Sequence, residues 1–395
     1  MSVFDDVTRQ ERERDASLKW SRTPGAIGAW VAEMDFPAPP PVLAAAAARV
    51  TSAHLGYPTP AETAELRSAT CDFVRDTFGW QIECSNVYLA ADVLSGLVEM
   101  IRRLTRPGSA VVVPTPAYMP FLTLPATEGR EVIEVPCSPD ESGVYRLDLE
   151  GIEDALKAGA GLVVLCNPWN PVGRVLSRTE LEALRDVVSR YDALVFADEI
   201  HAPLVHSPSA GAGHVPYASL PGAAAHTVTA LAATKAFNIP SLRCAQLIVT
   251  DANLAGRFAT SLHLLASQHS PVGAAASAAG YSRARGWLAS LNDYLAGNAR
   301  VFARELGACP LLRTFPIEGT YLAWVDATAL AQLLPEGRSV HDVVVKEALV
   351  DVNNGGACGS AYADYFRVNL ATSRELVTQL ARQIAAAANA YAQAG

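Results

Sequence analysis

The residues that could do chemistry in this chain centre on a lysine and an arginine that follow a strand-like run. Lys235 comes just after the apolar, partly β-branched segment 227–233, and Arg243 follows eight residues later. A lysine at the mouth of a buried strand loses hydration, holds its proton less firmly and can act as an amine nucleophile or base. Arg243 offers a planar fork of donors suited to a phosphate. The pair predicts Schiff-base chemistry beside an anion.

Two further polar clusters follow apolar runs in the same part of the chain. The run 162–165 leads into CNPWNPVG (166–173), and the run 193–196 leads into ADEIH (197–201). In an open α/β sheet the ligand crevice lies beyond the carboxyl ends of the strands. We therefore expect both clusters and Lys235 to converge on one crevice.

Each of these residues also has a plain structural interpretation. Lysine and arginine at this spacing are often solvated surface charges, and NPWNP is a turn sequence. Asp198 and Glu199 could be a helix cap and a solvated charge. His201 or Tyr118 alone could be structural, and Arg367 could lie at a strand edge. The order in which the motifs occur favours the chemical interpretation.

One cofactor, pyridoxal phosphate, matches these side chains. Its pyridine nitrogen needs an anion, its aldehyde an amine, its phosphate hydrogen-bond donors and its ring a flat neighbour. Asp198 could supply the anion and Lys235 the amine. Thr234 and Arg243 could serve the phosphate, and Tyr118 could lie against the ring.

The elements that must position these residues alternate between strand and helix. Apolar runs of strand length begin near residue 87 and lie at 110–113, 131–135, 162–165, 193–196, 228–231 and 246–249. Ser177 to Glu180 forms a capping box before a helix with apolar residues at helical spacing. This alternation predicts a doubly wound, mostly parallel sheet covered on both sides.

The chain divides into three segments that differ in proline content and in their pattern of predicted strands and helices. Residues 1–44 are predicted to form an N-terminal arm that belongs to a smaller domain, extended because of its prolines, with a helix following from 42 to about 53. Residues 45–280 form the large domain. Residues 281–395 form a small α+β domain, with a helix at 287–306, strands at 320–325 and 366–370, and a final helix after 372–375.

Composition limits the class of protein. The chain has 395 residues, 50% of them hydrophobic, so it can bury a large core, and its formal net charge of −9 argues against a nucleic-acid partner. An acidic N-terminus and the lack of a long apolar run predict a soluble cytoplasmic protein without a membrane segment. The seven scattered cysteines predict buried free thiols, with neither a disulfide framework nor a zinc site.

The order of the motifs resembles that of fold-type I aminotransferase-class enzymes. The motifs are Tyr57, Tyr118, NPWNPVG (167–173), DEIH (198–201), TKAFN (234–238) and FRVNL (366–370). Within this class the chain is most similar to the cystathionine β-lyase-like carbon–sulfur lyases, and the likeness runs from WVAEMDF (30–36) to EGTYLAW (318–324). The resemblance implies a large domain with a seven-stranded sheet and pyridoxal 5′-phosphate as cofactor.

The resemblance also implies roles for single residues. Lys235 would carry the Schiff base, Asp198 would pair with the pyridinium, Asn170 would bind the phenolate oxygen, and His201 falls where many relatives place a tyrosine of similar role. Tyr118 would stack on the ring. Arg243 would grip the phosphate together with Thr234, and Arg367 would clamp the substrate α-carboxylate. Tyr57 would reach the cofactor phosphate and the substrate in the neighbouring subunit, which predicts a homodimer with shared active sites.

Some positions depart from the family pattern. Ala232 replaces a hydroxyl often found three residues before the lysine. Asp92, which we place with Val93 beside the cofactor, stands where relatives have glycine or another small residue near the phosphate. A carboxylate there would repel the phosphate unless it turns away, and it could instead touch the ring or the substrate. Glu33 stands where aspartate is usual.

The function that we expect is β-elimination from an L-cysteine conjugate such as cystathionine, giving a thiol, pyruvate and ammonia. An aminotransferase, or another pyridoxal-phosphate enzyme that decarboxylates or deaminates an S-conjugated amino acid, could be built from the same residues. A non-catalytic regulator that keeps the fold is a third alternative, although no helix-turn-helix precedes the body of the chain.

Overall fold

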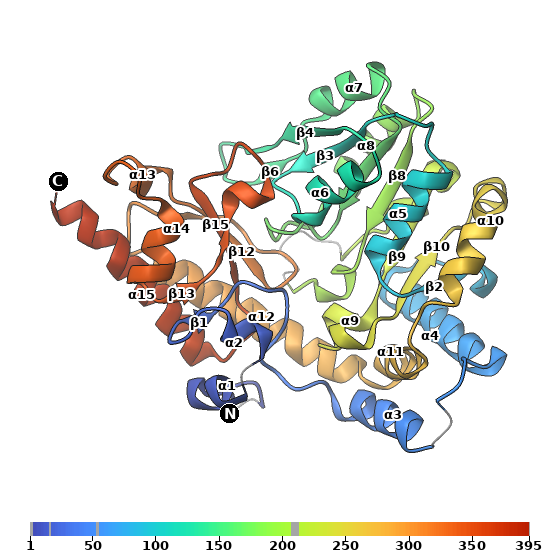
Figure 1. The fold of residues 1–395 in the computed structure, drawn as a ribbon, viewed down its shortest axis with the longest axis horizontal. Coiled ribbons are helices and arrows are strands. Elements are labelled where there is room, and N and C mark those ends of the chain that lie inside the picture. Colours follow the sequence, from blue (N-terminus) through green and yellow to red (C-terminus); the bar gives the residue numbers. More distant parts are fainter. Residues whose placement is uncertain (1–2, 16, 53–54, 207–212, 395) are drawn as a thin grey trace.

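A seven-stranded sheet forms the centre of the molecule in the computed structural model, which describes residues 3–15, 17–52, 55–206 and 213–394 (Figure 1). Its strands lie in the order β2-β10-β9-β8-β7-β3-β4. They are β2 (Val87–Ala90), β3 (Val111–Thr115), β4 (Val132–Pro136), β7 (Leu162–Cys166), β8 (Leu194–Asp198), β9 (Thr227–Leu231) and β10 (Ala245–Ile248). All seven runs predicted as strands belong to this sheet.

The sheet is parallel except at β10, which runs antiparallel to both β9 and β2. Strands β4, β3, β7, β8 and β9 pair in parallel. Every residue of β7 and β8 is buried, as expected for strands covered on both faces. The mostly parallel α/β fold predicted from the sequence is confirmed.

Alternate residues of the central strands face two separate helical layers. Val163 and Leu165 of β7 belong to the same core cluster as Leu181 and Leu184 of α8 (Arg178–Val188) and Ile152 of α7 (Leu149–Lys157). Leu162 and Val164 belong to a second cluster with α5 (Val93–Arg103) and α10 (Ala252–Ala266). The two-residue period of a strand produces this division.

The predicted capping box is present. The Ser177 side chain accepts a hydrogen bond from the Glu180 backbone at the start of α8, and the Glu180 side chain accepts from the Ser177 backbone. A second capping box, from Thr59 to Glu62, begins α4 (Pro60–Phe78). The predicted helix from 42 to about 53 is α3, which spans Pro40–Thr51.

A smaller four-stranded antiparallel sheet lies beside the large one. Its order is β11 (Arg313–Thr314), β12 (Leu322–Asp326), β15 (Tyr365–Asn369) and β14 (Asn353–Asn354). Helix α12 (Arg285–Leu306) packs against the final helix α15 (Arg374–Ala394). We propose that these elements form the small domain; the predicted boundary at residue 280 falls within α11 (Pro271–Arg283).

The remaining elements are short. They are α6 (Pro120–Thr127), α9 (Ala233–Ala236), α13 (Thr328–Ala331), α14 (Val340–Asp342), β5 (Ser138–Pro139) and β6 (Tyr145–Arg146). Of these, α9 matters most for function because it carries Lys235 directly after β9.

The N-terminal segment differs from the extended arm that its prolines predict. It contains α1 (Arg9–Asp15) and α2 (Leu18–Ser21), and then β1 (Ile27–Gly28) pairs in parallel with β13 (Val350–Asp351). A buried ion pair of 3.0 Å between Lys19 and Asp35 fixes the segment. The ion pair of Arg22 with Asp351 and a 3.5 Å hydrogen bond from Lys19 Nζ to the Ala371 carbonyl, which proline content does not reveal, hold it against the C-terminal elements. Figure 1 shows β1 beside β13.

The prediction of free thiols is wrong for one pair of cysteines. Cys71 in α4 and Cys84 before β2 form a disulfide, with their Cα atoms 5.8 Å apart. Their separation of 13 residues matches no recognised cysteine spacing, so only the approach of α4 to the start of β2 brings them together. The other five cysteines are free and buried.

The described residues contain neither a membrane-spanning helix nor a metal-binding cluster. None of their helices is long and apolar enough to cross a membrane. Among the same residues, no group of three or more histidine, cysteine, aspartate or glutamate side chains could hold a metal ion.

Candidate active site

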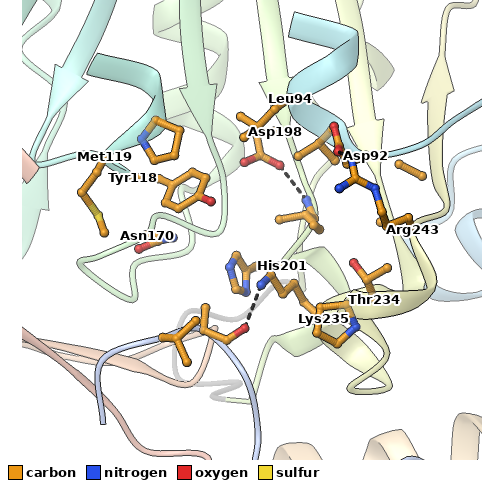
Figure 2. A pocket seen from close by; sticks show the side chains of 18 of the residues that line it. Asp92, Leu94, Tyr118, Met119, Asn170, Asp198, His201, Thr234, Lys235 and Arg243 are labelled. Carbon is orange, nitrogen blue, oxygen red and sulfur yellow. Dashed lines mark hydrogen bonds and ion pairs between the residues drawn. The ribbon is translucent and has the colours of Figure 1, made fainter. Parts of the chain in front are cut away.

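A cavity of about 480 Å³ opens at the carboxyl ends of the central strands. The residues predicted for the site that line it are Asp92, Val93, Tyr118, Asn170, Asp198, His201, Thr234, Lys235, Arg243 and Arg367. In Figure 2, Tyr118 and Asn170 lie on one side, Asp92 and Arg243 on the other, and Lys235 and His201 between them. The expected convergence of these clusters on one crevice is therefore found.

The amine of Lys235 is held by the backbone of the N-terminal segment. Its Nζ donates a hydrogen bond of 2.7 Å to the carbonyl oxygen of Ala32. Burial, together with the positive charge of Arg367, lowers the pKa of Lys235 to about 8. The neutral amine, which is the nucleophilic form, is thus accessible near neutral pH.

Asp198 ends β8 and is only 3% exposed. Its Oδ1 accepts a 3.2 Å hydrogen bond from the backbone N–H of Ile200. Burial raises the pKa of Asp198 to about 7, although Lys235 favours its ionised form. Its Oδ2 accepts a long hydrogen bond of 4.0 Å from the Cys166 thiol. A buried carboxylate with so few hydrogen bonds is a suitable partner for a cationic ring nitrogen.

His201 is neutral over the physiological pH range. Burial, aided by the positive charge of Lys235, lowers its pKa to about 3. Its ring meets the ring of Tyr321 edge to face at 5.7 Å. Within the described part of the chain its buried Nδ1 has no hydrogen-bond partner, so the ring keeps a polar atom for a bound group.

Arg367 reaches the cavity from β15 and is 2% exposed. Nη1 donates to Oδ1 of Asn170 at 3.0 Å, and Nη2 donates to the Trp30 carbonyl at 2.7 Å. Burial lowers the pKa of this guanidinium. Its Nε is buried without a partner among the described residues. A substrate carboxylate could accept hydrogen bonds from the N–H groups of this guanidinium.

Asp92 and Arg243 form an ion pair at the opposite end of the cavity from Asn170 (Figure 2). Asp92 is also the N-cap of α5, where its Oδ1 accepts from the Ser95 backbone at 2.8 Å. Thr234 lies at this end of the cavity as well. The end therefore combines a helix N-terminus, a guanidinium and a hydroxyl, the groups that bind phosphate in many proteins.

Tyr118 forms part of the cavity wall. Its ring meets Phe121 edge to face at 5.4 Å, and burial raises the pKa of its hydroxyl. Because Tyr118 lines the cavity, its ring could lie against a flat ligand there, and stacking on the cofactor stays a prediction.

Tyr57 is the one predicted site residue that the structure does not bring to the cavity. It is 91% exposed and lines a separate hollow with residues of α3 and α4, among them Arg49 and Glu62. Any contact of Tyr57 with a cofactor would have to be made in another subunit.

The segment around Trp30 was missed as a wall of the site. Trp30, Val31 and Ala32 line the cavity, together with Met119 and Asn353. The apolar composition of WVAEMDF indicated burial, but nothing in it indicated that backbone carbonyls would face a lysine.

Asparagine side chains hold this segment in place. Asn369 donates two 2.6 Å hydrogen bonds, to the carbonyls of Val31 and Glu33. Asn238, from the TKAFN motif, accepts from the Met34 N–H at 3.0 Å and donates to its carbonyl at 3.0 Å. Two motif asparagines thus position the wall that binds Lys235.

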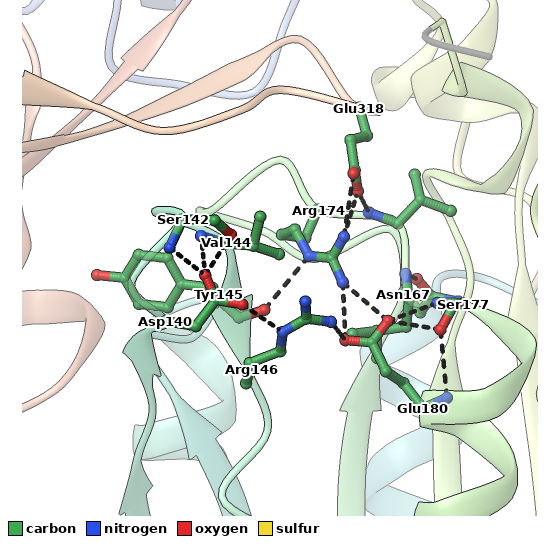
Figure 3. A network of polar contacts seen from close by, with 12 residues as sticks. Asp140, Ser142, Val144, Tyr145, Arg146, Asn167, Arg174, Ser177, Glu180 and Glu318 are labelled. Atoms are coloured by element: carbon green, nitrogen blue, oxygen red, sulfur yellow. Dashed lines mark hydrogen bonds and ion pairs between the residues drawn. The ribbon is translucent and has the colours of Figure 1, made fainter. Parts of the chain in front are cut away.

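Arg174, which follows the NPWNPVG motif, lies outside the cavity lining and joins two glutamates from different segments. Its Nη1 donates to both carboxylate oxygens of Glu318, at 3.0 and 2.8 Å, and its Nη2 to both oxygens of Glu180, each at 2.8 Å (Figure 3). Glu318 leads into Thr320 and Tyr321. The network therefore ties α8 to the segment that enters the small sheet.

The side chains fit pyridoxal 5′-phosphate. An amine of lowered pKa, a buried carboxylate, an aromatic wall and an arginine with a hydroxyl match the aldehyde, ring nitrogen, ring face and phosphate of this cofactor. The unpartnered Nδ1 of His201 and Nε of Arg367 leave polar atoms for the cofactor and its substrate. The fold and the site together define a fold-type I pyridoxal-phosphate-dependent enzyme.

The chain belongs to the aminotransferase class I and II family, whose model matches residues 31–384. The cystathionine β-lyase of Corynebacterium glutamicum is 32% identical over 378 residues, which cover 95% of this chain and 98% of that protein. The cystathionine β-lyase PatB of Bacillus subtilis is 29% identical over 96% of this chain and 98% of its own length.

Solved structures give the same result. A putative pyridoxal-phosphate-dependent β-cystathionase from Corynebacterium diphtheriae superposes with a TM-score of 0.88 at 32% identity, covering 97% of this chain and 98% of that one. The pyridoxal-phosphate-bound carbon–sulfur lyase from Staphylococcus hominis has a TM-score of 0.88 at 26% identity, with 98% of each chain covered. The family resemblance seen in the sequence is confirmed.

Proposed function

We propose that this chain is a pyridoxal-phosphate-dependent carbon–sulfur β-lyase that cleaves L-cysteine conjugates such as cystathionine to a thiol, pyruvate and ammonia. One observation carries the proposal: an amine of lowered pKa, a buried carboxylate and a buried arginine fork converge on a single cavity. The relatives named as cystathionine β-lyases support the choice of reaction.

Bound pyridoxal phosphate supplies an aldehyde and an electron-withdrawing ring that stabilises negative charge at the substrate Cα. Arg367 binds the substrate α-carboxylate through its fork, which fixes the direction of the Cα–H bond. Lys235, as the neutral amine, accepts the Cα proton. The electron pair left at Cα then forms a Cα–Cβ double bond while the Cβ–S bond breaks, and the pair of the broken bond leaves with the sulfur as a thiolate. The released aminoacrylate reacts with water to give pyruvate and ammonia.

Asp198 and His201 maintain the charge state of the site. Asp198 would keep a proton at the ring nitrogen of a bound cofactor, and that ion pair would offset the cost of burying the carboxylate. His201 remains neutral and offers a hydrogen bond without adding charge. Asn170 accepts a hydrogen bond from Arg367 through Oδ1, and its side-chain amide would bind the ring oxygen of the cofactor.

The test is a product assay on purified protein loaded with the cofactor. L-cystathionine and an S-alkyl cysteine should yield thiol and pyruvate in equal amounts, and Lys235→Ala should abolish both products. Lys157→Ala, at an exposed position at the end of α7, is the matched control and should have no effect. Cofactor-loaded protein that makes no thiol but transfers the amino group to a 2-oxo acid would contradict the proposal and favour an aminotransferase.

We also infer a homodimer in which Tyr57 enters the partner's cavity. Support comes from exposed apolar side chains near Tyr57, namely Leu43 and Val50 on α3 and Leu55 after it, each at least 50% exposed. Exposed apolar side chains grouped in this way are typical of protein interfaces. A cytoplasmic location stays a prediction from the sequence, which cell fractionation would test.

A further inference from the structure

The phosphate end of the cavity already contains an anion supplied by the chain. Both carboxylate oxygens of Asp92 are engaged: Oδ1 accepts from the Ser95 backbone at the start of α5, and Oδ2 pairs with Nη2 of Arg243. A guanidinium and the N–H groups of a first helical turn are the groups that would otherwise bind a phosphate. Asp92 therefore occupies the position suited to the cofactor phosphate.

The backbone of Arg243 adopts an unfavourable conformation to place this guanidinium. Arg243 has a φ of 44°, in the left-handed region that non-glycine residues seldom adopt. It follows the turn Pro240–Leu242, which leads into β10. Strain of this kind persists where the surrounding structure imposes it and is commonly found at ligand sites.

The negative charge of Asp92 offsets the positive charge of Arg243 at this end of the cavity. A phosphate ester carries a charge of about −1.5 to −2 at pH 7. The cations that line the cavity are Lys235, Arg243 and Arg367. Of these, Lys235 would serve the aldehyde and Arg367 the substrate carboxylate. Arg243 is thus the cation left for the phosphate, and Asp92 neutralises it before the phosphate arrives.

We propose that Asp92 competes with the cofactor phosphate for Arg243 and the α5 N-terminus, and so weakens the contribution of the phosphate to cofactor affinity. This inference rests on the proposed use of pyridoxal phosphate and not on the lyase reaction. Binding of the phosphate to Nη2 of Arg243 and to the Ser95 N–H requires the Asp92 carboxylate to release these two donors. The cofactor is therefore more exchangeable than it would be with a neutral residue at position 92.

The experiment compares two ligands that differ only in the phosphate. Apoprotein is titrated with pyridoxal 5′-phosphate and with pyridoxal, and the ratio of the two dissociation constants measures what the phosphate contributes. Asp92→Asn removes the charge and keeps a good N-cap residue. Because the ion pair is partly exposed, we expect binding of pyridoxal 5′-phosphate to tighten by about 3- to 10-fold, with pyridoxal binding unchanged.

Asp251→Asn is the matched control. Asp251 is the N-cap of α10, where its side chain accepts from the Leu254 backbone, and it does not line the cavity. This variant makes the same change of charge at the same kind of helix position, and both dissociation constants should stay as in the wild type. If Asp92→Asn fails to fold, judged by its circular dichroism, Asp92→Ser is used instead, because serine is also a good N-cap.

The outcomes separate this inference from the proposed function. A ratio in Asp92→Asn equal to that of the wild type, or a weaker binding of pyridoxal 5′-phosphate, would overturn the competition while leaving the proposed lyase intact. Failure of every variant and of the wild type to bind the cofactor would overturn both. If Asp251→Asn also binds pyridoxal 5′-phosphate more tightly relative to pyridoxal, the effect is a general one of protein charge. That result would also overturn the role of Asp92.

Discussion

The Nζ of Lys235 donates a hydrogen bond to the carbonyl oxygen of Ala32, a residue 203 positions earlier in the chain. The same carbonyl accepts a 3.0 Å hydrogen bond from the hydroxyl of Tyr321. A backbone carbonyl orients an amine without adding a charge, so the amine stays able to lose its proton. The N-terminal segment is in this way part of the chemical site.

The pKa of Lys235 predicts how the apoprotein captures an aldehyde. Since only the neutral amine attacks and the pKa is about 8, the rate should rise about tenfold per pH unit below pH 8 and level off above it. Mixing with pyridoxal phosphate, reducing with borohydride and measuring the modified peptide by mass spectrometry gives the rate. A rate that keeps climbing to pH 10 would contradict the lowered pKa. Lys235→Gln should show no modified peptide.

The same shift predicts a stability cost. The pKa of Lys235 is about 8 in the folded chain and 10.5 as the reference value, so the unfolded chain binds more protons between these values. Stability therefore rises with pH in this window, and the cost is complete below pH 8. Lys235→Met apoprotein should be more stable than wild type at pH 7 by about 3 kcal/mol. Urea unfolding at pH 7 and pH 10 should show the difference shrinking; a constant difference would refute it.

Replacing Arg367 by lysine should impair substrate binding selectively. Lysine keeps the charge but lacks the fork that holds Asn170 and the Trp30 carbonyl. We expect kcat/KM to fall by about 100-fold, with the absorbance spectrum of the bound cofactor unchanged. Steady-state kinetics on an S-alkyl cysteine check this. Full activity in Arg367→Lys would place the carboxylate elsewhere.

Mixed dimers test the position of Tyr57. Co-expression of Tyr57→Ala and Lys235→Ala chains should restore about a quarter of wild-type activity, because half of a random mixture consists of mixed dimers with one intact site each. Lys235→Ala mixed with Arg367→Ala is the control, since both residues line the same cavity, and it should restore none. Equal recovery in both mixtures would be inconsistent with a shared site.

The buried network of Arg174 should stabilise the fold more than its exposed neighbour does. The side chain of Arg174 is 6% exposed and that of Arg146 is 49% exposed, and both contact Glu180. Arg174→Lys leaves two partly buried carboxylates incompletely paired and should lower the free energy of unfolding by about 2–4 kcal/mol. Arg146→Lys should cost less than about 1 kcal/mol. Denaturant titration of both variants measures this, and equal losses would contradict the role of burial.

The large sheet and most of the cavity wall could be predicted because each depends on local pattern. Uninterrupted apolar runs such as 162–165 specify buried parallel strands, and the polar residues after them must then gather at one edge of the sheet. Asp198, Lys235 and Asn170 were placed together by this rule. Arg367 was placed by motif order, and the structure adds that its fork holds Asn170 and Trp30.

Contacts between distant segments could not be predicted from pattern. The carbonyl of Ala32 carries no side-chain signal, and its position depends on asparagines near the other end of the chain. The disulfide between Cys71 and Cys84 depends on how one helix approaches one strand. The pairing of Asp92 with Arg243 was also missed: the sequence predicted repulsion of the phosphate, and the structure shows which cation the carboxylate neutralises.

The wall formed by residues 30–32 contacts Lys235 and Arg367, which are made much later during synthesis. A nascent chain that has emerged only as far as the large sheet has the lysine but lacks the guanidinium that holds the Trp30 carbonyl. The ribosome must therefore release nearly the whole polypeptide before the pocket can exist. We expect the vitamin-derived group to meet all of its binding residues only once β15 has taken its place in the fold.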